Sequence, residues 1–384
     1  MPWTETCEMN EKVKFIAAWQ SDIYNLSELC RRFGVSRKTA YKWLERYEQE
    51  GVDGLKARSR ASHHHPNAIA KENIEVLLNL KVRYPHWGPR KIRDWLVLNK
   101  PHQAWPAAST MGDILKRHGL VKPRQGKKRT APLSAPLSHC ERVNQVWSSD
   151  FKGQFRLGQG PWCYPLTISD NHSRYLLLCR GLYRPTEQAV RPWFERVFRE
   201  YGLPEAMRTD NGSPFASTAL GGLTRLTIWW VKLGIRLERI EPGHPEQNGR
   251  HERLHRTLKA ATAWPPKQDL RAQQRSFNRF CHEYNYERPH EALGGCPPSH
   301  RYEASGRSYP VKLPAIDYPA DYTVRRVKTN GEIKWRGGRI YVSEALRGEP
   351  MGLLPIENDC WQLYFAHMKL GVLDERQGKI IRLG

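Results

Sequence analysis

The order of predicted strands and helices between residues 143 and 290 constrains the fold of this chain more than any other feature. Segments rich in β-branched and aromatic residues come first, and amphipathic segments then alternate with short apolar ones. Strands are predicted over 146–153, 162–169, 174–182, 206–209 and 235–240, and helices over 185–201, 215–233 and 270–286. Three consecutive strands followed by alternating helix and strand predict a mixed α/β domain.

Within this region, residues 242–258 form a loop that leads into a helix. The stretch opens with Pro and Gly, passes Asn248-Gly249, and continues without a helix breaker before Pro265. Glu252, Arg256 and Lys259 fall at i, i+4 and i+7, so they share one face of the predicted helix. A carboxylate followed by two cations is either a solvated ion-pair stripe or a site for a metal ion and a phosphate.

The N-terminal residues predict three helices. A helix over 11–20 is followed by a capping box at Asn25 and Glu28, a Gly-Val-Ser turn at 34–36, and a third helix to about Gln49. Helix, tight turn and second helix is the helix-turn-helix pattern, whose last helix meets DNA near its N-terminal end. The residues predicted to contact DNA there are Arg37, Lys38, Tyr41 and Lys42. The alternative is an ordinary three-helix bundle with a basic surface.

Basic segments flank a second predicted helical unit. Arg58 and Arg60 form an arm suited to phosphates or a minor groove. Helices are then predicted over 72–84, from the turn at Pro85 to Leu96, and from a cap at Ser109 to His118. This unit is either a second helix-turn-helix or a packing module. A linker over 122–138 follows, in which Lys127, Lys128 and Arg129 are further candidates for DNA contact.

After about residue 305 the pattern changes to short alternating strands. They are predicted over 322–328, 333–335, 339–342, 351–357, 361–365 and 369–374, with a hairpin turn at Asn330-Gly331. The expectation is a small β-barrel with a basic face formed by Arg325, Arg326, Lys328, Lys334 and Arg336. The predicted domains are therefore a helix-turn-helix domain (1–60), a second helical domain (61–121), a basic linker (122–138), an α/β domain (139–304) and a β-barrel (305–384).

The charge of the chain indicates a polyanionic partner. The 384 residues contain 62 Lys and Arg against 39 Asp and Glu, a formal net charge of +23. Nucleic acid is the simplest such partner. A membrane is not expected, because no stretch approaches 18 apolar residues and no basic and apolar leader opens the chain. The eight cysteines are scattered without a C-x-x-C pair, which predicts reduced thiols in a cytoplasmic protein.

Three acidic residues are candidates for catalysis. Asp150 lies within a predicted core strand, Asp210 ends another strand, and Glu252 lies on the helix after residue 249. Each has an ordinary alternative: a wet edge strand for Asp150, an Asp-Asn-Gly turn for Asp210, and a surface ion pair for Glu252. Asp170 precedes a turn and is expected to accept hydrogen bonds from the local backbone.

Carboxylates that converge repel one another unless cations neutralise them. Mg²⁺, with Mn²⁺ as a substitute, suits such oxygen ligands. Two ions about 3.5–4 Å apart activate an attacking oxygen and stabilise a leaving one in phosphodiester chemistry.

Several motifs together resemble insertion-sequence transposases of the retroviral-integrase type. They are Trp147-Ser-Ser-Asp150, Arg208-Thr-Asp210-Asn-Gly-Ser-Pro-Phe215, Pro242-Gly-His-Pro-Glu-Gln-Asn-Gly249, Glu252-Arg-Leu-His-Arg-Thr-Leu258 and Tyr284-Asn-Tyr-Glu-Arg-Pro-His-Glu-Ala-Leu-Gly294. The two N-terminal helical units are similar to the same subgroup, so the resemblance covers nearly the whole chain.

The resemblance implies an RNase H-like catalytic domain with an Asp-Asp-Glu triad that holds two Mg²⁺ ions. It also implies binding of terminal inverted repeats, cleavage that frees a 3′-hydroxyl, and transfer of that end into target DNA. Arg256 and Lys259 would grip the DNA end. A homo-oligomer on double-stranded DNA is expected, at the nucleoid of a bacterial cytoplasm.

One departure from the family pattern leaves two choices for the glutamate. The familiar spacing of 35 residues between the second Asp and the Glu points to Glu246, whereas the motif points to Glu252, with 41 residues between it and Asp210. We prefer Glu252, because a helix orients a ligand rigidly and only Glu252 shares its face with Arg256 and Lys259. The extra residues fit an insertion near 219–224. A non-catalytic repressor, a domesticated relic and a nuclease that cuts without joining are the competing hypotheses.

Overall fold

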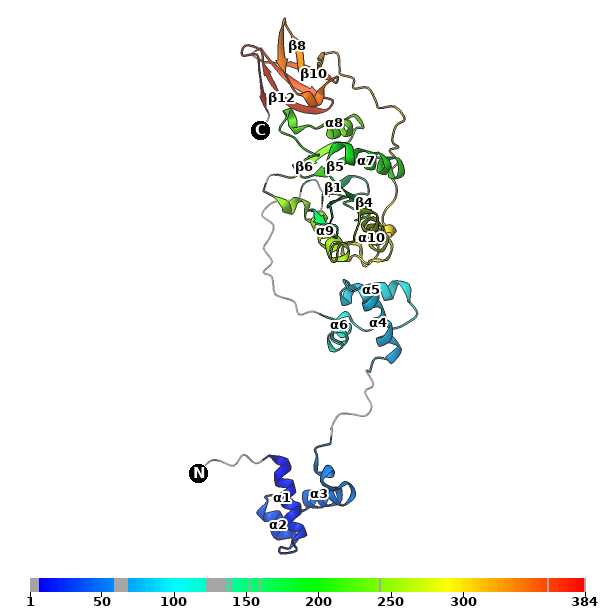
Figure 1. The fold of residues 1–384 in the computed structure, drawn as a ribbon, viewed down its shortest axis with the longest axis vertical. Helices are drawn as coiled ribbons and strands as arrows, with labels where there is room; N and C mark the ends of the chain where they lie inside the picture. Colours follow the sequence, from blue (N-terminus) through cyan, green and yellow to red (C-terminus); the bar gives the residue numbers. More distant parts are fainter. Residues whose placement is uncertain are drawn as a thin grey trace. The chain divides into compact units, whose positions relative to one another are not determined.

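The computed structural model describes residues 7–58, 68–121, 137, 140–151, 153–158, 160–241, 243–357 and 359–382. The chain divides into two compact units between Ala68 and Ile69. A first helical unit precedes this boundary, and a second helical unit, an α/β core and a C-terminal sheet follow it (Figure 1).

The first helical unit contains α1 (Glu8–Gln20), α2 (Leu26–Arg32) and α3 (Arg37–Glu50), closed by the 3₁₀ turn η1 (Gly51–Leu55). Asn25 and Glu28 form the predicted capping box, and the Ser36 side chain caps α3. The unit has its own apolar core, which includes Phe15, Ile16, Leu29, Ala40, Leu44 and Leu55. The predicted helix-turn-helix order is confirmed.

The second helical unit contains α4 (Lys71–Arg83), α5 (Pro89–Asn99) and α6 (Ala108–Arg117) around a core that includes Trp87. Its helices are confirmed, but the predicted cap at Ser109 is wrong. Ala107 occupies the N-cap position of α6 and makes no side-chain cap, so Ser109 lies inside the helix. A short polar side chain favours a cap, yet the chain here enters the helix two residues earlier.

A mixed sheet of six strands forms the middle of the α/β core. The strands are β1 (Val146–Phe151), β2 (Phe155–Arg156), β3 (Trp162–Asp170), β4 (Leu176–Leu182), β5 (Ala206–Thr209) and β6 (Arg236–Arg239). Strand β3 runs antiparallel to β1, β2 and β4, whereas β1, β5 and β6 are parallel neighbours. Strand β4 pairs only with β3 among the described strands, so it is an edge of the sheet.

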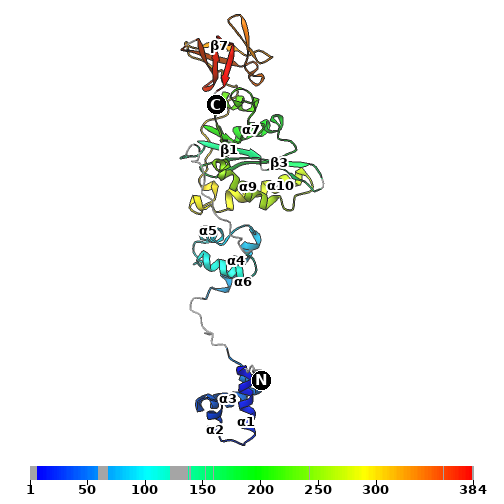
Figure 2. The same ribbon diagram turned by 90° about the vertical axis from the view of Figure 1, so that its left-hand side faces the viewer.

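Helices cover both faces of this sheet (Figures 1 and 2). One face packs against α7 (Glu187–Tyr201) and α8 (Arg225–Lys232) through an apolar cluster that includes Trp147, Phe194 and Trp230. The other face packs against α9 (Gly249–Thr262) and α10 (Leu270–His282) through a cluster that includes Leu258 and Phe277. This three-layer arrangement confirms the predicted α/β domain with a mixed sheet.

Two predicted helices differ from the structure at their ends. The helix expected over 215–233 begins only at Arg225, where Thr224 forms a capping box with Thr227. Gly221 and Gly222 before it both have positive φ, which interrupts a helix. The helix expected to reach Tyr286 ends at His282 and passes into the π-helical turn η4 (Glu283–Glu287).

The C-terminal strands form an open sheet. The order is β13 (Lys379–Arg382), β12 (Met368–Asp374), β11 (Cys360–Phe365), β10 (Pro350–Ile356) and β7 (Thr323–Arg326), and β8 (Glu332–Trp335) pairs separately with β9 (Gly338–Tyr341). No pairing between described strands joins β13 to β7, so the predicted closed barrel is not confirmed. Asn330-Gly331 forms a turn, closed by hydrogen bonds from the Gly331 N–H to the Lys328 carbonyl at 3.0 Å and from the Lys328 N–H to the Glu332 carbonyl at 2.8 Å, although β7 and β8 themselves do not pair. A second turn at Arg336-Gly337, both with positive φ, joins the paired strands β8 and β9.

The C-terminal sheet packs on the α/β core. Leu220, Ile228 and Val231 of the core belong to the same apolar cluster as the inner side chains of the sheet. Lys232 Nζ also lies 2.9 Å from Glu349 Oε1. The eight cysteines are all free thiols, and no helix among the described residues is long and apolar enough to cross a membrane.

Candidate active site

Asp150 and Asp210 come from neighbouring parallel strands. Strand β1 pairs with β5 in the register Val146↔Ala206 to Ser148↔Arg208. Carried two residues further, the same offset places Asp150 opposite Asp210, which directly follows β5. Adjacent strands lie about 4.8 Å apart. The two partly exposed aspartates therefore lie side by side at the carboxyl ends of the central strands β1 and β5.

Helix α9 lies over the same face of the sheet as Asp150. Thr167 is the cross-strand partner of Asp150 on β3. The Thr167 hydroxyl lies 2.7 Å from Nε2 of His251 and 2.7 Å from Nε2 of His255, both buried on α9. His255 Nδ1 also lies 3.6 Å from Asp150 Oδ2. A single strand hydroxyl therefore joins the aspartate strand to the helix that carries Glu252.

The His251 ring is anchored at both nitrogens. Its Nδ1 lies 3.0 Å from the Ser169 hydroxyl, and its Nε2 contacts Thr167. Burial lowers the pKa of His251 to about 3, so the ring is neutral at neutral pH. A neutral ring that bonds two side chains of β3 fixes the rotation of α9 on the sheet. This network cannot be predicted from the sequence, because the hydroxyls and the histidines are more than 80 residues apart.

A buried ion pair contacts the turn that precedes α9. The Arg208 guanidinium contacts Glu238 Oε2 through Nε at 3.2 Å and Nη2 at 3.0 Å, joining β5 to β6. Its Nη1 also lies 3.5 Å from the carbonyl oxygen of Gln247, in the turn η3 (Pro245–Asn248) that precedes α9. Because Arg208 is two residues from Asp210, the pair links the aspartate to the start of the helix.

Glu252, Arg256 and Lys259 are all exposed on α9, whereas Leu254 and Leu258 are buried. This confirms the predicted shared face. Neither cation lies within salt-bridge distance of Glu252 in the described part of the chain. The three charges therefore do not form the closed ion-pair stripe of the ordinary alternative, and they remain available to a ligand.

The fourth acidic residue of the region has a structural role. Asp170 is 1% exposed and accepts hydrogen bonds from the backbone N–H of Asn144 at 2.9 Å and of Ser173 at 2.7 Å. The Ser173 hydroxyl donates another at 2.6 Å. Burial raises the pKa of Asp170, and the three hydrogen bonds oppose that shift. The prediction that Asp170 serves the local backbone is confirmed.

The oxygen donors of the site fit magnesium in kind, because two adjacent carboxylates repel unless a cation lies between them. They do not form a complete metal site. No three His, Cys, Asp or Glu side chains of the described residues lie close enough together to hold an ion. The register thus brings two members of the predicted triad together, and Glu252 is exposed on α9.

The residues predicted to contact DNA in the first helical unit lie at the surface. Arg37, Lys38, Tyr41 and Lys42 are exposed on the first half of α3. The Arg37 Nη2 donates a hydrogen bond of 2.7 Å to the Ser27 hydroxyl of α2, and Arg58 pairs with Glu50. Arg60, Lys127, Lys128 and Arg129 lie outside the described residues.

Five family models match the chain. An integrase core domain matches residues 141–245, and a second integrase core model matches residues 233–298. A helix-turn-helix domain matches residues 11–63, a homeodomain-like domain residues 39–115, and the C-terminal domain of IS481 family transposases residues 322–381.

Relatives come from bacterial insertion elements and retroviruses. The insertion element IS407 uncharacterized 31.7 kDa protein of Burkholderia multivorans is 28% identical over 203 residues, 48% of this chain and 65% of that protein. The Gag-Pol polyprotein of baboon endogenous virus is 24% identical over 189 residues, 49% of this chain and 10% of the polyprotein. The matches span less than two thirds of either relative.

Solved retroviral structures are similar at a lower level. The HTLV-2 integrase catalytic core domain in complex with magnesium has 14% identity and a TM-score of 0.35, covering 43% of this chain and all of that one. The simian T-cell lymphotropic virus intasome has 15% identity and a TM-score of 0.38, covering 76% of this chain and 97% of that one. The domain matches, together with the insertion-element relatives, confirm the resemblance to integrase-type insertion-sequence transposases.

Proposed function

We propose that the chain is a DNA transposase that binds the terminal inverted repeats of a mobile element, cleaves the 3′ ends and joins them to target DNA. The proposal is supported by the register of β1 with β5, whose offset puts Asp150 opposite Asp210, and by the contact of Asp150 with His255 of α9, the helix that bears Glu252. In open α/β sheets, ligands commonly bind at the carboxyl ends of the parallel strands.

We propose that Asp150, Asp210 and Glu252 hold two Mg²⁺ ions, with Mn²⁺ as a substitute. The bound metal would supply charge neutralisation at the attacking and leaving oxygens of a phosphodiester. The chain itself orients the ligands. Thr167 and His255 hold Asp150 against α9, and the Arg208–Glu238 pair holds the strand that ends at Asp210.

The exposed cations beside Glu252 fit a DNA end. Arg256 and Lys259 lie one and two turns along α9, so they reach phosphates that flank the reacting bond. The first helical unit would supply sequence recognition through Arg37, Lys38, Tyr41 and Lys42 in the major groove. Arg58, Arg60 and the linker cations Lys127, Lys128 and Arg129 would add phosphate contacts. Because two ends react together, we propose a homo-oligomer on DNA.

The experiment is a strand-transfer assay with a labelled element end, target DNA and Mg²⁺. Asp150→Asn, Asp210→Asn and Glu252→Gln should each abolish end cleavage and joining, and Glu246→Gln should retain most activity. Loss of activity with Glu246→Gln and its retention with Glu252→Gln would overturn the choice of glutamate.

The same assay separates the competing functions. Binding of the ends without metal-dependent cleavage or joining would identify a repressor or a relic. Metal-dependent cutting without joining would identify a nuclease. Either outcome would overturn the transposase proposal.

A further inference from the structure

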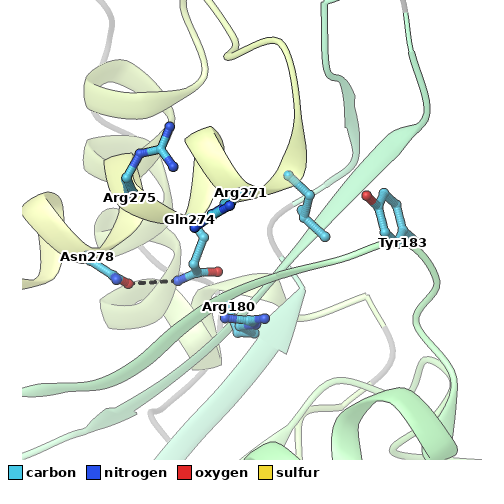
Figure 3. Close-up of a pocket in the computed structure, with 7 residues that line it drawn as sticks. Arg180, Tyr183, Arg271, Gln274, Arg275 and Asn278 are labelled. Carbon is cyan, nitrogen blue, oxygen red and sulfur yellow. Dashed lines mark hydrogen bonds between the residues drawn. The ribbon is translucent and has the colours of Figure 1, made fainter.

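A basic hollow lies at the edge of the α/β core, away from the aspartates. It has a volume of about 540 Å³ and lies between the edge strand β4 and helix α10. Its lining consists of Arg180, Tyr183, Leu270, Arg271, Gln274, Arg275 and Asn278 (Figure 3). Three of these seven residues are arginines and none is acidic.

The three arginines lack carboxylate partners in the part of the chain that the structure describes. No Asp or Glu of the described residues lies within salt-bridge distance of Arg180, Arg271 or Arg275. The Arg180 Nε is buried without a hydrogen-bond partner, and its guanidinium lies 3.9 Å from the centre of the Trp193 ring. Desolvation and the nearby Arg196 both lower the pKa of Arg180. The hollow therefore carries uncompensated positive charge.

The walls of the hollow are fixed. Gln274 accepts a hydrogen bond from the Gly181 backbone N–H at 3.0 Å and donates one to the Cys179 carbonyl at 2.9 Å, so α10 is pinned to β4. It also donates to Asn278 Oδ1 at 2.8 Å, the bond drawn in Figure 3. A Cβ on Gly181 would lie 2.8 Å from Leu270 Cδ1, which shows how closely the helix approaches the strand. The arginines thus project from a rigid frame.

A second hollow of similar size differs from the first in charge, because its arginines are paired with acids. It has a volume of about 490 Å³ and is lined on α7 by Pro192, Glu195, Arg196, Arg199 and Glu200. There, Arg199 lies 2.7 Å from Glu195 and Arg196 lies 3.7 Å from Glu200. Two acids pair with two cations on α7, whereas no acid among the described residues pairs with the cations between β4 and α10.

We infer that the hollow between β4 and α10 binds the sugar–phosphate backbone of DNA. Arg271 and Arg275 are exposed on successive turns of α10, about 6 Å apart along the axis. A row of guanidinium groups suits a chain of phosphates better than a single anion. Tyr183 is 55% exposed at one end, where its ring offers a surface for a sugar or a base.

This inference deepens the proposed function by assigning a further part of the DNA contact. Strand β4 is separated from β1 by β3, so the hollow lies about 10 Å across the sheet from the Asp150 strand. DNA held there is away from the reacting bond. The hollow should therefore affect binding of DNA and leave the cleavage step at saturating DNA unchanged.

The test compares two double variants of the full chain in DNA binding without divalent metal. Arg271→Gln with Arg275→Gln should weaken binding of a duplex about tenfold. It should also reduce the slope of log K against log salt by about 2, since each lost phosphate contact accounts for about 0.9. Arg191→Gln with Arg199→Gln removes the same charge from α7, where Glu187 and Glu195 pair with these cations, and should leave both quantities within error of the wild type.

A residue-resolved measurement needs no variant. The wild-type chain is treated with an arginine-specific dicarbonyl reagent with and without duplex DNA, and modified peptides are quantified by mass spectrometry. DNA should protect Arg271 and Arg275 several-fold more than Arg191 and Arg199 of α7. Equal protection of the two pairs, or none, would overturn the inference.

Two further outcomes are distinct. An α10 variant with unchanged DNA affinity but an altered sedimentation coefficient would assign the hollow to contact between copies of this chain and overturn the inference. Suppose the wild type binds DNA with the expected arginine protection but shows no metal-dependent cleavage. That result would overturn the proposed transposase function and still support DNA binding by the hollow between β4 and α10.

Discussion

The two helical units have similar helices but use their polar surfaces differently. The first unit keeps the exposed residues of α3 clear of its own core. The second unit directs its polar groups toward the exit segment of the α/β core, residues 283–291. Trp87 Nε1 donates a 2.9 Å hydrogen bond to Glu283 Oε1, and the Tyr84 hydroxyl contacts Glu287. Similar local patterns therefore leave polar side chains exposed on α3 in one unit and pack polar side chains against the core in the other.

The junction between the second unit and the exit segment is polar and partly buried. Lys91 Nζ donates to the Pro289 carbonyl oxygen at 2.5 Å, and burial lowers its pKa to about 8. Burial also raises the pKa of Glu283, which Trp87 opposes by donating its hydrogen bond. Buried groups of this kind stabilise only while their partners remain, because an orphaned group keeps its desolvation cost. The junction should therefore be sensitive to single substitutions.

The largest expected effect is that of Trp87→Ala. The side chain is fully buried, so its removal should cost about 3–5 kcal/mol of unfolding free energy, and orphaning Glu283 adds about 1–3 kcal/mol. Unfolding in urea, followed by hydrogen exchange of separate peptides, should show the loss in both the second helical unit and the exit segment. Leu29→Ala is the matched control and should destabilise only the first unit. If Trp87→Ala destabilised only α4–α6, the claim that the second unit and the exit segment stabilise each other would be wrong.

Local signals in the sequence predicted the first unit better than the second. The capping box at Asn25 and the cap at Ser36 depend on residues three positions apart, which a sequence displays directly. In the second unit, Ser109 suggested a cap that the structure places at Ala107, and nothing nearby indicated that Trp87 would meet Glu283, 196 residues away. The sequence predicted either a second helix-turn-helix or a packing module. The contacts with residues 283–291 show packing, and the homeodomain-like model that matches residues 39–115 fits the helix-turn-helix alternative.

In the candidate site, too, local motifs were predictable from the sequence and tertiary contacts were not. The aspartates and Glu252 could be named from motifs, and the exposure of Glu252, Arg256 and Lys259 followed from helical spacing. The contact of Thr167 with His251 and His255 could not be predicted, because it depends on how α9 rotates over the sheet. Helical pattern likewise failed at Gly221 and Gly222, whose positive φ delays the start of α8.

Acid should weaken the second unit's junction without a matching effect in the first. Burial, with nearby Lys91, Arg288 and Arg174, lowers the pKa of His290 to about 3 from the usual 6.5. Below pH 6.5 the imidazole of His290 takes up a proton in the unfolded chain but stays neutral in the folded chain until about pH 3. The free energy of unfolding is therefore unaffected by His290 above pH 6.5 and decreases as the pH falls from 6.5 toward 3. At pH 4 the loss is about 3 kcal/mol.

The measurement is urea unfolding at pH 7 and pH 4 for the wild type and His290→Gln. The wild type should lose about 3 kcal/mol more than the variant. His251 is present in both proteins, so its contribution cancels. The described part of the first unit contains no histidine, so its own transition should be the same in the two proteins at each pH. Equal losses in wild type and variant would show that His290 is solvated and that the junction is open.

DNA binding should distinguish the units by about 1–2 kcal/mol. Lys38→Ala with Lys42→Ala removes two exposed cations from α3 and should weaken binding of an element end about tenfold. Lys116→Ala with Arg117→Ala removes two exposed cations from α6 and should change affinity less than twofold. Titration of a labelled end at fixed salt measures both. An equal loss from the α6 pair would make the second unit a DNA-binding module as well as a packing module.

The smallest expected effects concern helix caps. Asn25 accepts the Glu28 N–H at 2.9 Å, and Glu28 accepts the Asn25 N–H at 3.2 Å, so Asn25→Ala should destabilise the first unit by about 1 kcal/mol. In the second unit, Ala107 is exposed with extended backbone at φ −59° and ψ 151°, a conformation that a capping Ser adopts without strain. Ala107→Ser should therefore stabilise α6 by roughly 0.5–1 kcal/mol. Hydrogen exchange at the first turn of each helix measures both changes. If Ala107→Ser slows exchange in the exit segment as well as in α6, the second unit and the core unfold together, whereas a change limited to α6 would mean that the junction opens before the helices melt.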